Sequence, residues 1–320
     1  MELIRGLHNL TRMRRTLAGT GCALTIGNFD GVHCGHKRVI AQLRLRADQL
    51  GLPAWAMFFE PQPMEFLAPD KAPPRLTGFK TKVRLLAEQP LDALICLPFN
   101  KQFAGLTAQA FIEHVLVDQL NVKQLIVGDD FRFGGNREGD FSMLVRYGQQ
   151  YGFDVERIDT HVSGAERASS TRVRHALLQG DFIQAEALLA RPYTMHGKVI
   201  VGRSLGRTLN VPTANIAVTG QMPPLSGVYV VEVELPGHGE LVPGVANLGV
   251  KPTLGDEMGL LLEVHLLDFS EDLYGQELTV YFRNKIRDER DFGSLEALKQ
   301  QINKDIETTR SYFQSIKASQ

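Results

Sequence analysis

The chain has little of what several protein classes require. Its 320 residues include only three cysteines, Cys22, Cys34 and Cys96, and no two of them form a CxxC pair. A sparse, odd number of cysteines argues against a disulfide framework and is typical of a reducing compartment, so we expect a cytoplasmic protein. No apolar run approaches the roughly 18 residues of a membrane-spanning helix, and the N-terminus lacks the apolar core of a secretory signal. We therefore expect no membrane attachment.

An excess of charge is also missing. The formal net charge is −1, from 35 basic and 36 acidic residues. Proteins that bind long nucleic acids gain affinity from Lys and Arg on phosphates, so this balance predicts no nucleic acid partner. The length favours about two domains. We expect a two-domain protein that acts on small molecules.

The first half alternates short apolar runs with helix-like segments. The strand-like runs lie at 22–29, 53–60, 91–99 and 124–131. This alternation predicts a parallel sheet covered by helices on both faces. Ligands of such sheets bind beyond the carboxyl ends of the strands. Two glycine-rich stretches, GNFDG (27–31) and GDDFRFGG (128–135), fall at these ends.

The second half has a different texture. One long helix, predicted at 171–190, closes the first half, and Pro192 marks the break after which the texture changes. Short strands such as 196–202 and 227–235 then follow, separated by Gly, Pro and Asn turns, and the next helix is predicted at 294–313. This pattern predicts an antiparallel barrel or sandwich finished by one amphipathic helix. The predicted domains are 1–187 and 188–320.

The stretch GNFDGVHCGH (27–36) places two histidines at a strand-to-helix turn. His33 and His36 are three residues apart, so both can face the same side of the first helical turn. A helix N-terminus favours anions, and the glycines, beginning with Gly27, permit a close approach. Zinc would need three or four ligands, and no further Cys/His cluster lies nearby. We predict a triphosphate site, although the spacing alone also fits two ordinary, partly exposed histidines.

A second stretch, RASSTRVR (167–174), carries hydroxyls and arginines at the start of the helix expected after it. Helix N-terminal N–H groups and arginine forks both suit phosphate oxygens. A capped helix with solvated arginines is the plain alternative for this stretch alone. Together with the histidine pair, it favours a clamp on a triphosphate. Its candidate residues are Arg167, Ser169, Ser170, Thr171, Arg172 and Arg174.

Several motifs in fixed order resemble bacterial bifunctional riboflavin kinase/FAD synthetases. In the first half they are GNFDGVHCGH, FEPQP (59–63), VGDDFRFG (127–134) and SSTRVR (169–174). In the second half they are GRTLNVPTAN (206–215), GVANLGVKPT (244–253), LEVHLLDFSEDLYGQ (262–276) and IRDERDFGSLEALKQQI (286–302). The resemblance implies an α/β Rossmann-like nucleotidylyltransferase domain, followed by a riboflavin kinase-like antiparallel β-barrel with a terminal helix.

By this resemblance, the barrel phosphorylates riboflavin with ATP to FMN and ADP. The first domain then transfers AMP from ATP to FMN, giving FAD and pyrophosphate. His33 and His36 are implied to act in catalysis on the ATP phosphates. Phe59 and Phe133 are flavin-binding candidates because aromatic faces suit a planar ring, with plain core positions as the alternative. The implied ATP-binding residues of this domain are Gly27, Asp30, His33, His36, Asp130, Arg167, Ser170, Thr171 and Arg174.

In the second half the resemblance gives roles to residues with weaker signals of their own. The motif PTAN (212–215) would by itself favour a turn, but Thr213 and Asn215 offer oxygens that suit Mg²⁺ shared with ATP. Period-two alternation places Glu263 on the face of its strand opposite to the apolar residues. On this pattern alone, Glu263 also fits an ordinary solvated side chain. The resemblance implies that Glu263 is the base for the 5′-hydroxyl of riboflavin. The implied ATP-binding residues of the barrel are Gly202, Gly206, Arg207, Thr213 and Asn215.

Two rival functions fit parts of these patterns. The HxGH motif also occurs in aminoacyl-tRNA synthetases and other nucleotidyltransferases, but no KMSKS motif is present. A flavin- or nucleotide-binding regulator without catalysis is the other rival. The joint presence of His33, His36, Thr213, Asn215 and Glu263 counts against it.

Overall fold

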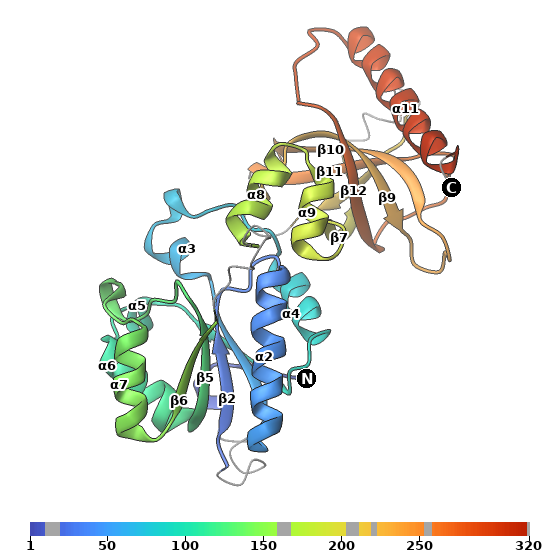
Figure 1. Ribbon diagram of the computed structural model, residues 1–320. Helices are drawn as coiled ribbons and strands as arrows, with labels where there is room; N and C mark the ends of the chain where they lie inside the picture. The colour runs from blue at the N-terminus through green and yellow to red at the C-terminus, as the bar shows by residue number, and fades with distance from the viewer. Residues whose placement is uncertain (10–19, 159–167, 203–210, 219–222, 253–257, 319–320) are drawn as a thin grey trace. The chain divides into compact units, whose positions relative to one another are not determined.

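The computed structural model describes residues 1–9, 20–158, 168–202, 211–218, 223–252 and 258–318 (Figure 1). They belong to two compact units. The first consists of Met1–Pro73 and Phe79–Ser169, and the second of Pro74–Gly78 and Ser170–Gln320. Within the described ranges, no helix has the length and apolarity needed to cross a membrane.

The first unit is built on a six-stranded sheet in the order β1-β4-β3-β2-β5-β6, and every neighbouring pair is parallel. Its strands are β1 (Glu2–Arg5), β2 (Cys22–Ile26), β3 (Ala54–Glu60), β4 (Ala93–Pro98), β5 (Val122–Gly128) and β6 (Asp154–Ile158). Its α-helices are α2 (Cys34–Leu50), α3 (Pro63–Leu67), α4 (Phe79–Ala87), α5 (Lys101–Ala104), α6 (Ala108–Ala110) and α7 (Phe141–Tyr151). Its other helices are η1 (Leu7–Asn9), η2 (Pro69–Lys71), the π-helix η3 (Phe111–Gln119) and η4 (Gly135–Arg137).

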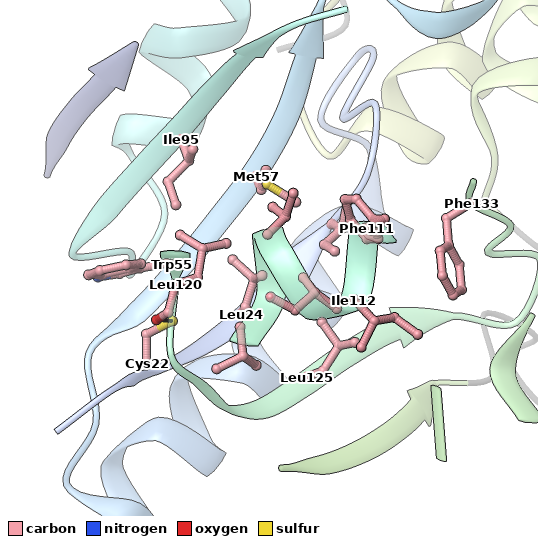
Figure 2. Packing of buried hydrophobic residues seen from close by; sticks show 14 of the residues in the cluster. Cys22, Leu24, Trp55, Met57, Ile95, Phe111, Ile112, Leu120, Leu125 and Phe133 are labelled. Carbon is pink, nitrogen blue, oxygen red and sulfur yellow. Dashed lines mark hydrogen bonds between the residues drawn. The ribbon is translucent and has the colours of Figure 1, made fainter. Parts of the chain in front are cut away.

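Helices cover both faces of this sheet, with α2 and α7 on opposite sides (Figure 1). One core lies beneath α2 and α4, where Ile40 and Leu43 are fully buried against the strands. The other lies beneath η3, where Phe111 and Ile112 pack with Leu24 and Met57 of the central strands (Figure 2). Burial on both faces explains why β2 and β4 read as apolar runs rather than alternating ones.

The strand order reverses between β2 and β5. From β2 the chain builds outward to β3 and β4 on one side, and β5 and β6 are added on the other. Such a reversal opens a crevice beyond the carboxyl ends of the two strands, where parallel sheets bind ligands. The sequence did not predict β1, which pairs in parallel with β4 at the sheet edge.

The second unit is a closed antiparallel barrel in the order β10-β11-β8-β7-β12-β9. Its strands are β7 (Thr194–Ile200), β8 (Ala214–Ala217), β9 (Gly227–Glu234), β10 (Val242–Pro252), β11 (Met258–Leu266) and β12 (Glu277–Arg287). Its helices are α8 (Ser170–Leu178), α9 (Phe182–Leu189) and α11 (Leu295–Ala318). Closure leaves no unpaired strand edge.

One ion pair fastens the terminal helix to the barrel. Asp305 of α11 is 2% exposed, and Arg287 at the end of β12 donates to it from Nε and Nη2, at 3.0 and 2.8 Å from Oδ2. Removing one partner of a buried pair costs about 3–5 kcal/mol. The pair therefore holds α11 against the strands.

The predicted fold class is confirmed, with one correction. The helix expected at 171–190 is two helices, because Gly180 takes a left-handed φ of 74° and ends α8. The Asp181 side chain then accepts from the Gln184 backbone N–H at 2.9 Å and begins α9. Both helices belong to the second compact unit. The domain boundary at 187/188 stays a prediction.

Candidate active sites

The turn after β2 lies at the crevice between β2 and β5 and has an unusual backbone. Phe29 and Val32 have φ values of 47° and 42°, and Gly31 between them has 82°. A β-branched residue at positive φ is an outlier, and such residues gather at functional sites. Gly27 precedes the turn, and a Cβ there would stand 3.3 Å from the ring of Phe29. The ring of Phe29 therefore packs closely over the backbone of Gly27.

His33 begins helix α2 as its N-cap. The residue is 6% exposed, and its Nδ1 accepts the backbone N–H of His36 at 3.4 Å. Because Nδ1 is the acceptor in this hydrogen bond, the proton of the neutral ring belongs on Nε2. The cap thus leaves His33 with an N–H donor at a helix N-terminus, where anions are favoured.

His36 stacks on His33. The ring centroids are 3.7 Å apart with 20° between the ring planes, and Phe29 meets His36 edge-on at 5.2 Å. The Nδ1 of His36 is shielded from solvent and accepts or donates no hydrogen bond with any described residue. Burial, followed by the charges of His33 and Lys82, lowers the pKa of His36 well below its ordinary value. His36 is therefore neutral at pH 7.

Lys82 is a residue that sequence reasoning missed. It lies on α4 and is 0% exposed, with Nζ 5.1 Å above the ring of Phe58. Lysine is almost never fully buried without a compensating interaction, and a cation over an aromatic face is one. Its charge acts on the ring of His36. Its position in the sequence gives no signal, because lysine is common on amphipathic helices.

The two acidic candidates differ in exposure. Asp30 lies in the turn and is 1% exposed, whereas Asp130 is exposed just after β5. Because β2 and β5 are parallel neighbours, both residues follow strands that end at the same edge. Ala168 also reaches this turn, since its carbonyl oxygen lies 2.9 Å from where a Cβ on Gly35 would stand.

The second half of the predicted clamp begins helix α8. Ser170 is the first residue of α8 and is half-buried, and Thr171 is exposed. Arg174 donates from Nε to the carbonyl of Pro74 at 2.6 Å. These three residues belong to the second compact unit, and Arg167 lies outside the described residues. The joint clamp stays a prediction.

A cavity of about 650 Å³ lies in the first unit, lined in part by Phe99, Phe103 and Phe111. Glycines and polar residues from 134–138 line another part of its wall. A volume in this range and aromatic walls suit a planar ligand. These phenylalanines were not among the predicted site residues, although LPFNKQF (97–103) follows a strand and could have signalled them.

The two predicted flavin residues pack against the residues that line this cavity. Phe59 meets the rings of Phe99 and Phe103 at 5.6 and 5.0 Å. Phe133 is 8% exposed and stands 5.5 Å from Phe111. Their direct contact with a flavin stays a prediction.

In the second unit, the predicted base and metal ligand are cross-strand partners. Glu263 of β11 pairs directly with Asn215 of β8 in the antiparallel register. Leu262, Val264 and Ile216 beside them are at most 1% exposed and fill the barrel interior. Because side chains alternate along a strand, Glu263 and Asn215 share the outer face. Glu263 is half-buried and Asn215 is 6% exposed.

The backbone of Gly202 approaches Asn215 so closely that no side chain fits between them. A Cβ on Gly202 would overlap the side-chain amide of Asn215. Asn215 also pairs with Ile200 of β7. Two of the predicted ATP-binding residues, Gly202 and Asn215, therefore lie next to each other. Two others, Gly206 and Arg207, lie outside the described residues.

Thr213 lines a cavity of about 400 Å³ at one end of the barrel. Pro212 before it accepts a hydrogen bond from Nδ1 of His265 at 2.8 Å, which holds the segment against β11. The cavity wall continues through Phe269, Leu273 and Tyr274. Among the described residues, no group of three or more His, Cys, Asp and Glu side chains is placed to hold a metal ion.

The fold defines a class of protein: a parallel-sheet α/β domain followed along the chain by a closed antiparallel β-barrel. A family model described as FAD synthetase matches residues 16–172, and one described as riboflavin kinase matches residues 189–313. The chain is 49% identical to the bifunctional riboflavin kinase/FMN adenylyltransferase of Escherichia coli (strain K12), with 98% of each chain covered. The chain belongs to the bifunctional riboflavin kinase/FMN adenylyltransferase family.

Two further comparisons agree with this membership. The Haemophilus influenzae protein of the same name is 47% identical and covers 98% of this chain and 100% of its own. A crystal structure named macrolide-efflux protein, from Streptococcus pneumoniae, is 29% identical with a TM-score of 0.76. It covers 97% of this chain and 99% of its own, so the two share one fold along their lengths. The predicted family and bifunctional, ATP-dependent enzyme class are confirmed.

Proposed function

We propose that the barrel converts riboflavin and ATP to FMN and ADP, and that the parallel-sheet unit converts FMN and ATP to FAD and pyrophosphate. Membership in the family and the matches to both domain families support this pair of reactions. The observation that carries the assignment of residues is the direct pairing of Glu263 with Asn215 beside Gly202.

In the barrel, the Glu263 carboxylate accepts the proton of the riboflavin 5′-hydroxyl. The hydroxyl oxygen then attacks the γ-phosphorus of ATP, and the bond to the ADP oxygen breaks. A general base of this kind contributes about 10²–10⁴-fold to a rate. Asn215 stands on the adjacent strand, so the nucleotide phosphates belong on the β8 side of Glu263.

The residues at this site fit a magnesium ion. The Thr213 hydroxyl and the Asn215 amide supply the neutral oxygens that Mg²⁺ uses together with nucleotide phosphates. The close approach of Gly202 to Asn215 keeps the amide clear of other side chains. Thr213 and Asn215 would hold Mg²⁺, which supplies charge neutralisation of the transferring phosphate when bound.

In the parallel-sheet unit, the phosphate oxygen of FMN attacks the α-phosphorus of ATP, and pyrophosphate leaves. His33 offers Nε2–H at the helix N-terminus, and neutral His36 offers its Nε2 beside it. Donors fixed in this way stabilise charge that builds on the phosphate during attack. The cavity lined by Phe99, Phe103 and Phe111 receives the flavin ring.

The test is to incubate the protein with riboflavin, ATP and Mg²⁺ and to separate the flavins by chromatography over time. FMN is expected first and FAD second, and a chelator should stop both. Asn215→Ala should raise the Mg²⁺ concentration needed for FMN formation, with Asn284→Ala on exposed strand surface as the control. Absence of both products in the folded protein would overturn the proposal. Cys22, Cys34 and Cys96 form no disulfide with one another, which agrees with a cytoplasmic enzyme.

A further inference from the structure

Asn247 stands in one row with the two residues of the kinase site. In the barrel register, Asn247 of β10 pairs directly with Glu263 of β11, which pairs directly with Asn215 of β8. Directly opposed residues in antiparallel strands have Cβ atoms about 4.5–5.5 Å apart and point to the same face. Ala246 and Leu248 on either side of Asn247 are 0% exposed and fill the barrel interior. Asn247 therefore shares the outer face with Glu263.

The side chain of Asn247 is available to a ligand. It is half-buried, and it makes no hydrogen bond with any other residue that the structure describes. Beyond it on the same face of β10, a Cβ on Gly249 would overlap the carboxylate of Glu289. The next residue of the row is Val228 on β9, which is apolar and 4% exposed. Asn247 thus has Glu263 on one side of it in the row and the buried Val228 on the other.

We infer that Asn247 binds a hydroxyl of the ribityl chain of riboflavin and so positions the 5′-hydroxyl at Glu263. This inference rests on the proposed role of Glu263. Adjacent strands are about 4.8 Å apart, so a group bound by Asn247 lies about that far from Glu263. A polyol with a hydroxyl on each carbon presents another hydroxyl at this range, a few carbons from its 5′ end. An amide both donates and accepts, which matches a hydroxyl.

The three residues of the row then bind successive parts of the two substrates. Phosphates belong beside Asn215, the reacting hydroxyl beside Glu263, and the polyol beside Asn247. Asn247 acts as a positioning and specificity residue, since it does not touch the transferred phosphate. Loss of one such hydrogen bond is worth about tenfold in kcat/KM.

The experiment compares riboflavin with analogues that lack one ribityl hydroxyl. Wild-type protein should phosphorylate riboflavin about tenfold better, in kcat/KM, than the analogue that lacks the bound hydroxyl. Asn247→Ala should lose about tenfold with riboflavin and nothing further with that analogue, so its discrimination disappears. Discrimination against the other analogues should stay. Asn284→Ala, the same change at an exposed position of β12, should leave all values unchanged.

Folding and the underlying function are checked separately. Asn247→Ser keeps a hydrogen-bonding hydroxyl and should recover part of the loss, and thermal unfolding should show that each variant is folded. If Asn247→Ala discriminates among all analogues as the wild type does, the inference is wrong. If Glu263→Gln keeps full kinase activity, the proposed site itself is wrong, whatever Asn247 does.

Discussion

The two proposed sites differ in the structural element that presents their polar groups. In the parallel-sheet unit, His33 and His36 lie at the start of α2. The position at the helix N-terminus and the protonation of the two rings determine how these residues interact with an anion. In the barrel, Asn215 and Glu263 stand on neighbouring strands, and the register of a closed sheet sets their spacing. The first arrangement depends on local backbone and protons, and the second on the alignment of strands far apart in sequence.

This difference has a consequence for how each site fails. A helix-terminus site should respond to changes in ring charge and in the turn that precedes the helix. The barrel site formed by Asn215 and Glu263, here called the strand-row site, should respond to any change that moves one side chain relative to its partner. The strands that carry these residues are fixed by pairing with a neighbour on each side. Variants can therefore damage one site while the other reports that the chain is intact.

The largest effect is expected for Glu263→Gln. Loss of the base should lower the rate of FMN formation by about 10²–10⁴-fold, because the 5′-hydroxyl then loses its proton acceptor. FAD formation from supplied FMN should stay within twofold of wild type. Both rates are measured by flavin chromatography. Glu240→Gln, at an exposed turn, is the matched control, and equal loss of both rates in Glu263→Gln would contradict the assignment.

His36→Ala should have the opposite effect, with FAD formation lost and FMN formation kept. It removes one donor from the helix-terminus site and should lower FAD formation from FMN by about 10²–10³-fold, with FMN formation from riboflavin preserved. The exposed His114 on η3 supplies the control, and His114→Ala should change neither step. A His36→Ala protein that still makes FAD at the wild-type rate would remove this histidine from the mechanism.

Gly202→Ala tests the strand-row site without changing a polar group. The added methyl group would overlap the amide of Asn215, and a displacement of about 1 Å at a catalytic group can cost about 10²-fold in rate. Kinase activity should fall, and the Mg²⁺ concentration that gives half-maximal rate should rise. Gly239→Ala is the control, because nothing lies within 4 Å of a Cβ there. Unchanged kinase kinetics in Gly202→Ala would show that this contact is unimportant.

The stability of the first unit should depend on His36 below neutral pH. Burial holds the pKa of His36 well below the ordinary histidine value, so between these two values the unfolded chain binds a proton that the folded chain does not. The free energy of unfolding should therefore fall as the pH drops below about 6.5, by at most about 1.4 kcal/mol per pH unit from this residue. His36→Gln should remove that part of the slope.

Trp55 makes this measurement specific to the first unit. It is the only tryptophan of the chain and is 4% exposed on β3, so its fluorescence reports unfolding there. Denaturant titrations of wild type and His36→Gln between pH 7.5 and about 5.5 give the two slopes. Identical slopes would mean that His36 is protonated equally in the folded and unfolded states.

The smallest effect is expected for Cys34→Ala. Cys34 is the first residue of α2 and is half-buried between the two histidines in sequence, yet alanine suits a helix at least as well. FAD formation should stay within twofold of wild type. A severe loss of FAD formation in a folded Cys34→Ala protein would give the thiol a role that the histidine site does not include.

The local patterns of the sequence predicted the layers of the first unit and left a barrel or a sandwich open for the second, where the family resemblance implied the barrel. Apolar runs alternating with helices predicted the parallel sheet, and period-two alternation placed Glu263 on the outer face of its strand, as observed. The break at Gly180 was missed because one glycine inside an apolar periodic segment does not by itself end a helix. The four-residue strand β1 was missed because its pairing with β4 is not local.

The candidate sites were predictable only where their chemistry is contiguous in sequence. The histidine pair lies within four residues, so its helix-terminus position followed from the motif. Lys82 and Asn247 reach their sites from other elements, by packing of α4 and by strand register. The aromatic wall of the first unit likewise combines α5 and η3 with the loop that follows β5. Such combinations depend on tertiary packing, which local patterns do not encode.

The most direct test of two separate sites mixes two defective proteins. His36→Ala and Glu263→Gln are each incubated with riboflavin, ATP and Mg²⁺, alone and together, and the flavins are separated by chromatography. His36→Ala alone should stop at FMN, Glu263→Gln alone should leave riboflavin unchanged, and the mixture should form FAD. A mixture that forms no FAD, with both proteins folded, would contradict the assignment of one reaction to each site.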